Sequence, residues 1–320
     1  MTKPSFAKIN YLLRPNKNVE RKLIVEALTA LNDSFRISQY DYIGMGSMWF
    51  VDFILVHKIL NIQNMISIEK EVYAKRADFN KPYDCITVLA GDTTEVLRNM
   101  SELQRQAIIW LDHDTGLNGP ALEDARIICE RAGSKNIFIL TVKADHTELR
   151  RETIGHKRFS RLNSLKQIAG DLVPVGTTDR NIQKDEFPKL VAKMLFSHMK
   201  SSLKKSGRRE QFYPLFNMFY SDGSPMVTVG GMIVNEEDKI LLQRSNLPGI
   251  FDYVTGETQF RINVPHLTVK EKIELDSMLP RENAPTSNDI EEIGFFLSDD
   301  ELKSYHKLYR YYPVFGEFSL

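Results

Sequence analysis

The chain has 320 residues, 42% of them hydrophobic and 26% charged, a composition typical of a globular protein rather than a fibrous, disordered or membrane-spanning one. Basic and acidic residues balance at 42 each, so the overall charge favours no particular class of partner. The two cysteines, Cys85 and Cys129, argue against a disulfide scaffold and form no CxxC zinc motif.

The N-terminal residues predict a helical arm over 1–36. They lack the apolar core and small-residue cleavage site of a signal peptide. No stretch reaches the roughly 18 apolar residues that cross a bilayer, so we expect a cytoplasmic protein that does not bind membranes. Residues 18–31 place their apolar side chains on one helical face. The arm also carries four basic residues, Arg14, Lys17, Arg21 and Lys22. They could form a basic lid over a ligand cleft, although an exposed helix face is the simpler interpretation.

Five short apolar segments follow the arm, each ending in small or acidic residues. They are rich in Ile, Val and aromatic residues and too short for typical helices, so they predict strands. The strands are expected at 40–46, 64–69, 85–92, 107–114 and 136–142, with helices between them at 47–60, 72–78, 94–106 and 120–132. Because apolar strands alternate with helices, we predict an α/β fold with a parallel, doubly wound sheet covered on both faces.

A basic, mostly helical segment follows at 143–209, with a helix expected at 187–204. From 150 to 209 the chain holds 15 basic residues against 5 acidic ones. Such a stretch could bind nucleic acid or another anionic partner, or could be a solvated helix face. Residues 211–220 and 225–234, joined through Asp-Gly, then predict an antiparallel hairpin.

The C-terminal residues 256–320 predict a helical appendage. Two S/T-x-x-E capping boxes, Thr268 with Glu271 and Ser298 with Glu301, would each open a helix. Residues 280–289 between these helices, PRENAPTSND, predict an exposed linker.

Glycine and acidic residues stand at the ends of the predicted strands. In DYIGMGS, Gly44 and Gly46 would let the backbone turn sharply and approach a ligand, with Ser47 opening the next helix. Glu69 ends the second strand and Asp92 ends the third, at nearly regular intervals along the chain. Because the carboxyl ends of parallel strands share one edge of the sheet, these residues are expected in one crevice. There Glu69 could bind ribose hydroxyls and Asp92 an adenine amine, or Asp92 could only cap a helix.

The fourth strand ends in WLDHD (110–114), which is the candidate reacting edge. Asp112 or His113 could accept a proton from a substrate hydroxyl. Asp112 and Asp114 could instead hold a divalent metal, but no further ligand can be located, so no metal site is predicted. Asp114 could also only cap the next helix. Since side chains alternate along a strand, Asp112 and Asp114 could share a side while His113 faces away. We prefer Asp112 for the chemistry.

The ordered set of glycines and acids resembles class I S-adenosylmethionine-dependent methyltransferases over about residues 37–235. The resemblance implies a Rossmann-like, mostly parallel, seven-stranded sheet in which the hairpin supplies strands six and seven. It implies S-adenosylmethionine as cofactor, bound by Gly44, Gly46, Ser47, Glu69, Asp92 and Thr93. The glycines would contact the methionine part, Glu69 the ribose, and Asp92 with Thr93 the adenine. Residues 8–22 and the WLDHD run are also similar to bacterial proteins described as O-methyltransferases.

The sequence pattern divides the chain into three parts, and the resemblance implies one activity. The parts are the helical arm over 1–36, a methyltransferase-like domain over 37–255 that includes the basic segment 143–209, and the appendage over 256–320. The activity is methyl transfer to an oxygen atom of an unidentified acceptor, because the fourth strand lacks the D/N-P-P-Y/F sequence that positions an amino group. Two alternatives remain open: a non-catalytic binding or assembly protein that keeps the fold, and a nucleic-acid methyltransferase that uses the basic 150–209 surface.

Two other residues depart from the pattern of that family. Tyr42 stands where the family usually has an acid, and Met48 replaces the third glycine of its loop. The larger Met48 side chain could narrow or block the cofactor pocket.

Overall fold

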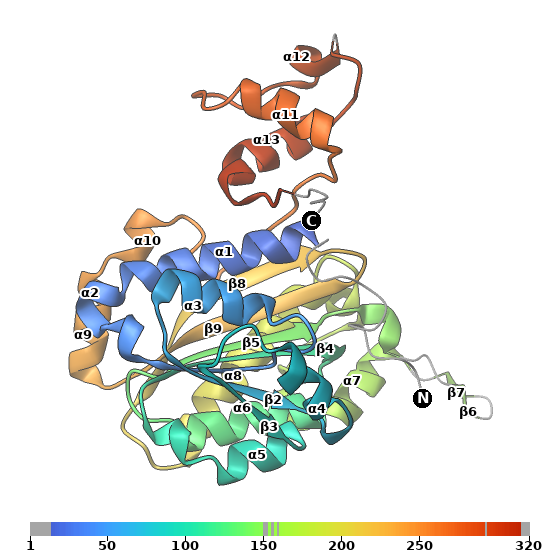
Figure 1. The fold of residues 1–320 in the computed structure, drawn as a ribbon. Coiled ribbons are helices and arrows are strands. Elements are labelled where there is room, and N and C mark those ends of the chain that lie inside the picture. Colours follow the sequence, from blue (N-terminus) through green and yellow to red (C-terminus); the bar gives the residue numbers. More distant parts are fainter. Residues whose placement is uncertain (1–13, 150–152, 155–156, 159, 292, 315–320) are drawn as a thin grey trace.

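An eight-stranded sheet forms the centre of the structure, a computed structural model that describes residues 14–149, 153–154, 157–158, 160–291 and 293–314 (Figure 1). Within these residues the strand order is β10-β8-β9-β5-β4-β1-β2-β3, and a separate small sheet pairs β6 (Thr153–Ile154) with β7 (Lys157–Arg158). The strands of the main sheet are β1 (Asp41–Gly44), β2 (Asn64–Glu69), β3 (Ile86–Ala90), β4 (Ala107–Gly116), β5 (Ile137–Lys143), β8 (Gln211–Ser221), β9 (Pro225–Val234) and β10 (Phe260–Arg261). The predicted α/β fold is confirmed.

The parallel half of the sheet sets the direction in which the strands point. β1 lies between β2 and β4 and runs parallel to both, with Gly44 opposite Ser67 and Trp110. β3 and β5 extend this parallel part on either side, and β9 with β8 adds the predicted antiparallel hairpin. The carboxyl ends of β1, β2, β3 and β4 therefore lie along one edge of the sheet.

The eighth strand, β10, corrects the prediction of seven strands. Phe260 and Arg261 pair in parallel with Met218 and Phe219 of β8. They lie within 256–320, where the sequence predicts only helices. A pairing of two residues leaves no periodic pattern of apolar side chains, so the sequence carries no signal for it.

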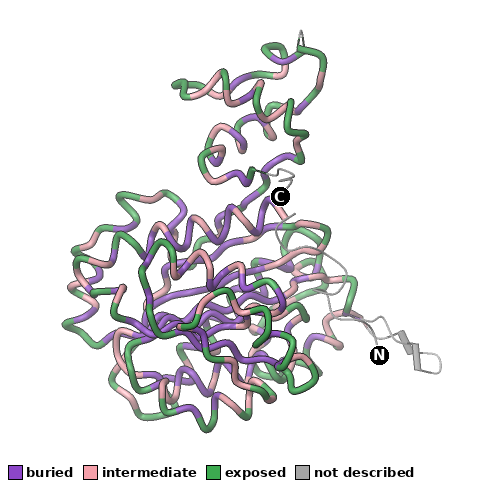
Figure 2. The backbone as a smooth tube through the Cα atoms, in the orientation of Figure 1, coloured by how far each residue is buried: buried purple, intermediate pink, exposed green. Residues whose placement is uncertain are grey.

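Helices cover both faces of the sheet and enclose two hydrophobic cores (Figures 1 and 2). One face is covered by α1 (Pro15–Ala30) and α3 (Val51–Leu60). The opposite face is covered by α5 (Thr93–Asn99), α6 (Gly119–Arg131), α7 (Arg161–Ala169) and α8 (Phe187–Lys205). The remaining helices of the main body are α2 (Asn32–Phe35), α4 (Glu71–Asn80), α9 (Glu236–Arg244) and α10 (Leu247–Ile250). Figure 2 shows the sheet and the inward sides of these helices as buried chain.

Helix α1 is a buried helix and not an exposed one, which corrects the simpler interpretation of its basic residues. Leu23, Ile24 and Leu28 are fully buried, and the helix packs beside α3 and β8. Two of its basic side chains are buried as well: those of Lys17 and Arg21 are each only 3% exposed, while Lys22 is half-buried. The first two can lie inside because acidic side chains on β4 and α3 face them. Positions 1–13 of the predicted arm lie outside the described part of the chain.

The N-terminus of α1 is capped by the turn between β8 and β9. Arg14, at the N-cap position, makes no side-chain cap hydrogen bond. Instead the Asp222 carboxylate accepts the N–H of Asn16 at 3.2 Å and the N–H of Lys17 at 2.9 Å. The Asn16 side chain also donates to Asp222 at 2.9 Å and accepts the N–H of Val264 at 2.9 Å. Three segments that are far apart in the sequence therefore meet at this helix end.

The C-terminal residues form a small helical unit on the α1 side of the main body (Figure 1). Both predicted capping boxes are present, at the starts of α11 (Val269–Ser277) and α13 (Asp299–Leu308). The predicted linker 280–289 is partly helical, because α12 (Ser287–Glu291) begins inside it.

The basic segment folds mainly as α7 and α8, with residues 150–152, 155–156 and 159 outside the described part of the chain. The predicted helix at 187–204 is confirmed as α8. Arg208 turns inward: its guanidinium donates to the carbonyl oxygen of Cys129 at 3.1 Å and pairs with Glu210 at 3.1 Å. It is therefore not part of an open basic surface. None of the helices in the described residues is long and apolar enough to cross a membrane.

Replacing Asp222 with alanine should lower the free energy of unfolding by about 1 kcal/mol, because two N–H groups of α1 lose their acceptor. Urea unfolding followed by circular dichroism measures this change. Asp252→Ala is the matched control, since Asp252 forms an exposed ion pair with Lys307 at 2.7 Å and exposed pairs contribute little. Equal stability of the Asp222 variant and the wild type would contradict the capping role.

Candidate functional site

A pocket of about 300 Å³ opens at the edge of the sheet where β1, β2, β3 and β4 end. Its wall includes every predicted site residue except Gly44: Gly46, Ser47, Glu69, Asp92, Thr93, Asp112, His113 and Asp114. Side chains from four separate strand ends thus line one cavity, as the parallel topology predicts.

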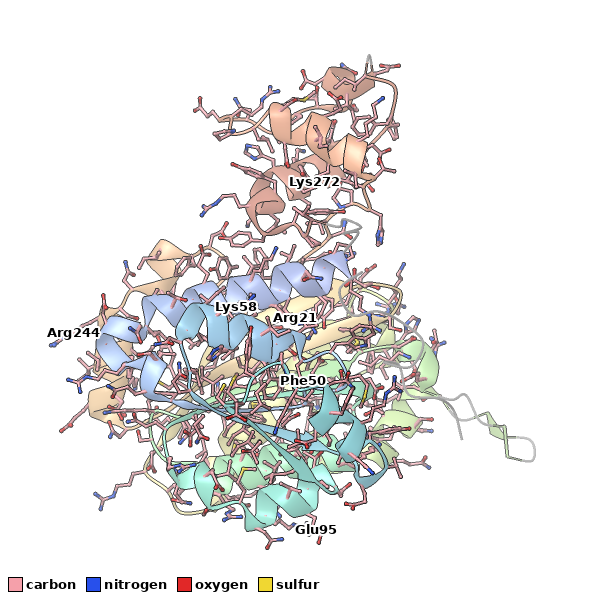
Figure 3. The ribbon with its side chains drawn as sticks, in the orientation of Figure 1. Arg21, Phe50, Lys58, Glu95, Arg244 and Lys272 are labelled. Atoms are coloured by element: carbon pink, nitrogen blue, oxygen red, sulfur yellow. The ribbon has the colours of Figure 1, made fainter. Side chains whose placement is uncertain are left out.

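The loop after β1 forms one side of the pocket and depends on glycine at position 46. A Cβ on Gly46 would lie 2.4 Å from the ring of Phe50, a distance that no side chain can occupy. The Gly46 N–H donates to Ser67 Oγ at 2.9 Å, and the Ser47 N–H donates to Glu69 Oε1 at 2.7 Å. Ser47 and Phe50 both adopt the left-handed conformation, at φ 52° and 49°. The chain therefore turns tightly here, and α3 begins at Val51 rather than at Ser47 (Figure 3 labels Phe50).

Two other residues of this region lie outside the pocket wall. Gly44 is buried in β1, where a Cβ would come within 3.2 Å of the Tyr42 ring and the Trp110 carbonyl oxygen. This glycine therefore allows close packing inside the sheet and does not line the cavity. Met48 points into the hydrophobic core and is 8% exposed, so it does not narrow the pocket.

Glu69 is the last residue of β2, and its side chain accepts hydrogen bonds that hold the glycine loop in place. Its Oε1 accepts the Ser67 hydroxyl at 2.9 Å in addition to the Ser47 N–H. Burial raises the pKa of Glu69, and these hydrogen bonds partly oppose that rise. The carboxylate is 8% exposed and lies in the pocket wall.

Asp92 has both of the roles that its sequence position allows. Its side chain caps α5 by accepting the N–H of Thr94 at 3.1 Å. It also lines the pocket together with Thr93 and Thr94. The capping role alone would explain an aspartate here, so its function toward a ligand stays a prediction.

The end of β4 departs from the regular alternation of side chains. The register against β5 shifts between Asp112 and Gly116, as at a β-bulge. As a result Asp112, His113 and Asp114 all line the pocket, and the expectation that His113 faces away is wrong. The N-cap of α6 is Asn118, so Asp114 does not cap that helix.

Asp112 is held by a buried lysine from α1, which the sequence analysis did not foresee. Lys17 Nζ lies 3.0 Å from Asp112 Oδ2 and 2.8 Å from Glu20 Oε2. Burial alone would raise the pKa of Asp112, but the charges of Lys17 and Arg21 outweigh it and hold the pKa below its usual value. Asp112 is therefore a fixed anion and a weak base.

His113 is paired with a buried carboxylate on α6. His113 Nε2 lies 3.4 Å from Asp124 Oδ2, and the Asp124 side chain is 1% exposed. Asp124 Oδ1 in turn accepts the Thr94 hydroxyl at 2.5 Å. Among the described residues, His113 Nε2 and Asp124 Oδ2 make no hydrogen bond, so Asp124 places a buried carboxylate beside the imidazole without bonding to it.

The sequence did not identify several residues of the pocket wall, among them Trp49, Asp52, Asn118 and Asp124. Asp52 stands in the first turn of α3 and Asp124 in α6, positions where an aspartate reads as an ordinary helix residue. Trp49 follows the glycine loop directly, which is the one signal that could have identified it. Within the described ranges no group of three or more His, Cys, Asp or Glu side chains is placed to hold a metal ion.

The Lys17–Asp112 pair can be tested by a double-mutant cycle with Lys17→Met and Asp112→Asn. Each single change should cost roughly 3–5 kcal/mol of unfolding free energy, because it leaves a buried charge without its main partner. The double variant should be more stable than the sum of the two losses by about 1–3 kcal/mol. Urea unfolding gives all four values, and strictly additive losses would contradict the coupling.

The Asp112→Asn variant should also change the way in which the stability of the protein depends on pH. Because the pKa of Asp112 is lowered in the folded state, its carboxylate stabilises the fold above about pH 4. That contribution is lost as the pH falls through the lowered value. Asp112→Asn should therefore flatten the loss of stability with acid below about pH 4, and an unchanged slope would count against the pairing.

Comparisons with solved structures show the fold. The chain is similar to Trm1 from Pyrococcus horikoshii in complex with S-adenosyl-L-methionine, with a TM-score of 0.50 and 11% identity over 75% of this chain and 60% of that chain. An O-methyltransferase family protein from Burkholderia thailandensis aligns with a TM-score of 0.36 and 10% identity over 67% of this chain and 57% of that one, which is too distant to carry an argument. The chain thus spans about 60% of the length of the first of these structures.

The sequence comparisons give the family. No curated protein sequence matches the chain. A family model described as "Putative O-methyltransferase" matches residues 9–320, which is nearly the whole chain. The chain, with its mixed sheet and its pocket at the carboxyl edge of the parallel strands, belongs to that family.

Proposed function

We propose that the protein transfers the methyl group of S-adenosylmethionine to an oxygen atom of an acceptor that is not yet identified. The observation that carries the proposal is the convergence of Ser47, Glu69, Asp92 and Asp112 on one pocket at the ends of four strands. Membership of the O-methyltransferase family supports it. So does the likeness of the fold to a structure that holds this cofactor.

The pocket offers groups that fit the adenosine half of the cofactor. Glu69 Oε1 is used by the glycine loop, and the second carboxylate oxygen would accept hydrogen bonds from the ribose hydroxyls. Asp92 and Thr93 would bind the adenine edge from the β3–α5 turn. The cofactor would supply an electrophilic methyl group on a positively charged sulfur.

We assign His113 as the general base that removes the proton of the acceptor hydroxyl. In the transfer, the acceptor oxygen forms a bond to the methyl carbon as the carbon–sulfur bond breaks, and the hydroxyl proton must leave. Nδ1 of His113 would accept that proton, with the Asp124 carboxylate 3.4 Å from Nε2 on the other side of the ring. Asp112 is less suited to accept it, because Lys17 keeps its pKa low. Asp112 would instead provide fixed negative charge beside the sulfonium, and Asp114 would lie at the exposed mouth.

The basic segment 150–209 supports a finer hypothesis about the partner, an anionic macromolecule such as nucleic acid. Lys204 and Lys205 are exposed in the last turn of α8. Salt-dependent binding of mixed RNA and DNA, with a slope that falls when both lysines are changed to glutamine, would support that partner. Binding that is absent at low salt would remove it.

Glu69→Gln should weaken S-adenosylmethionine binding by roughly 10- to 100-fold, because a charged acceptor of the ribose hydroxyls becomes a neutral amide. Isothermal titration calorimetry measures the affinity. Glu71→Gln, on the exposed start of α4, is the matched control and should bind as the wild type does. A folded wild-type protein without saturable binding would favour the non-catalytic alternative.

His113→Gln should reduce kcat by at least about 100-fold and leave the affinity for S-adenosylmethionine unchanged, because only proton removal is lost. Methyl transfer from labelled cofactor to a panel of phenols and alcohols measures turnover. His266→Gln, at an exposed position, controls for a general effect of losing a histidine. Normal turnover of the His113 variant would remove this residue from the chemistry.

A further inference from the structure

A buried arginine–aspartate pair lines the pocket where α1 passes over the start of α3. Arg21 Nε donates to Asp52 Oδ1, and the two residues are 2% and 8% exposed. Both belong to the pocket wall, together with Gly46 and Trp49. Figure 3 shows Arg21 on the side of α1 that faces the sheet and Phe50. The pair is thus out of bulk water but accessible to a ligand in the cavity.

One donor of Arg21 has no hydrogen-bond acceptor. Within the residues that the structure describes, Arg21 Nη1 is buried and makes no hydrogen bond. A buried charged donor without an acceptor is costly, and native proteins rarely keep one without a ligand or water to satisfy it. Because the guanidinium fork matches a carboxylate in shape and charge, a ligand carboxylate is the natural acceptor.

Asp52 provides the complementary charge at the same place. Its contact with Arg21 uses Oδ1, and the second oxygen of the carboxylate would accept a hydrogen bond from a cationic donor. Asp52 stands in the first turn of α3, near the end of the helix dipole that attracts negative charge. An arginine donor and an aspartate acceptor side by side match an ammonium and a carboxylate carried on one carbon atom.

The charges around the pair favour a zwitterion over a simple anion. Asp112 also lines the pocket and acts electrostatically on Arg21, as Asp52 does. A phosphate or sulfate ion would bring further negative charge close to these two carboxylates. A zwitterion brings no net charge and satisfies both members of the pair.

We propose that Arg21 and Asp52 form a binding site for a zwitterionic α-amino acid group, with the ligand carboxylate on Arg21 Nη1 and the ligand ammonium on Asp52. Two sources share this chemistry: the methionine end of S-adenosylmethionine, which rests on the proposed function, and an acceptor that is itself an amino acid. In the first case, the pair makes the protein bind S-adenosylmethionine more tightly than compounds that lack its amino acid group. In the second it selects the acceptor.

Calorimetry with S-adenosylmethionine and 5′-methylthioadenosine separates these cases, because the second compound has the same adenosine and thioether but no amino acid group. Arg21→Gln should weaken S-adenosylmethionine binding by roughly 10- to 100-fold, the loss of one charged hydrogen bond. It should change methylthioadenosine binding less than about twofold, since no contact to adenosine is lost. Asp52→Asn should show the same selectivity. Lys58→Gln, on the exposed side of α3, is the matched control and should leave both affinities unchanged.

Arg21→Lys guards against a variant that fails to fold, because lysine keeps the ion pair with Asp52 but lacks the fork. This variant should retain the thermal stability of the wild type. Its affinity for S-adenosylmethionine should still fall more than its affinity for methylthioadenosine. Equal weakening of both ligands in the Lys and Gln variants would overturn the proposal, since the pair would then only shape the pocket.

Titration of L-methionine and L-tyrosine, with and without S-adenosylhomocysteine, tests the acceptor as the source. Binding of L-tyrosine that is lost in Arg21→Gln, with cofactor affinity unchanged, would support the amino acid acceptor. If the wild type binds neither nucleoside but binds L-methionine through Arg21, the proposed function fails and the site stands. If Arg21→Gln changes no affinity for any of the four ligands, the site is refuted.

Discussion

The pocket depends on one constraint: a lysine ammonium that is buried away from water needs an anion beside it. Lys17 meets this need with Glu20 on its own helix and Asp112 on β4, and its ammonium also lies over the rings of Trp110 and Tyr220, at 5.6 and 5.4 Å. The contact fixes α1 over the end of β4 and fixes Asp112 in the cavity wall. The charge that shapes the site and the helix that covers it are therefore parts of one interaction.

Much of the fold could be predicted from the sequence because its signals are local. The strand at 64–69 has the same bounds in the structure, since its short run of Met65, Ile66 and Ile68 is too short for a helix and lies between polar residues. The capping boxes before α11 and α13 depend on residues three positions apart and are also present. β10 and the bulge in β4 could not be predicted, because both arise from pairing with another strand and leave no periodic pattern.

The site could be predicted only as far as topology determines it. Parallel strands bring their carboxyl ends together, so Glu69, Asp92 and Asp112 share a cavity. The direction of the basic residues on α1 depends on where that helix packs, and the acids that neutralise them lie on α3 and β4. A pattern of apolar residues identifies the buried face of a helix, but it does not reveal that Lys17 and Arg21 are buried with it. Gly44 illustrates the opposite error, since a glycine needed for packing inside a sheet looks the same as one needed beside a ligand.

The way α1 is capped has a consequence for how the chain is made. The helix lies near the beginning of the chain, yet its first N–H groups are satisfied by Asp222, 205 residues later than Lys17. During synthesis on the ribosome, these hydrogen bonds form only after the turn between β8 and β9 has been made. Contacts between such distant residues also slow folding. The cap of α1 is therefore formed only after all five parallel strands β1 to β5 have been synthesised.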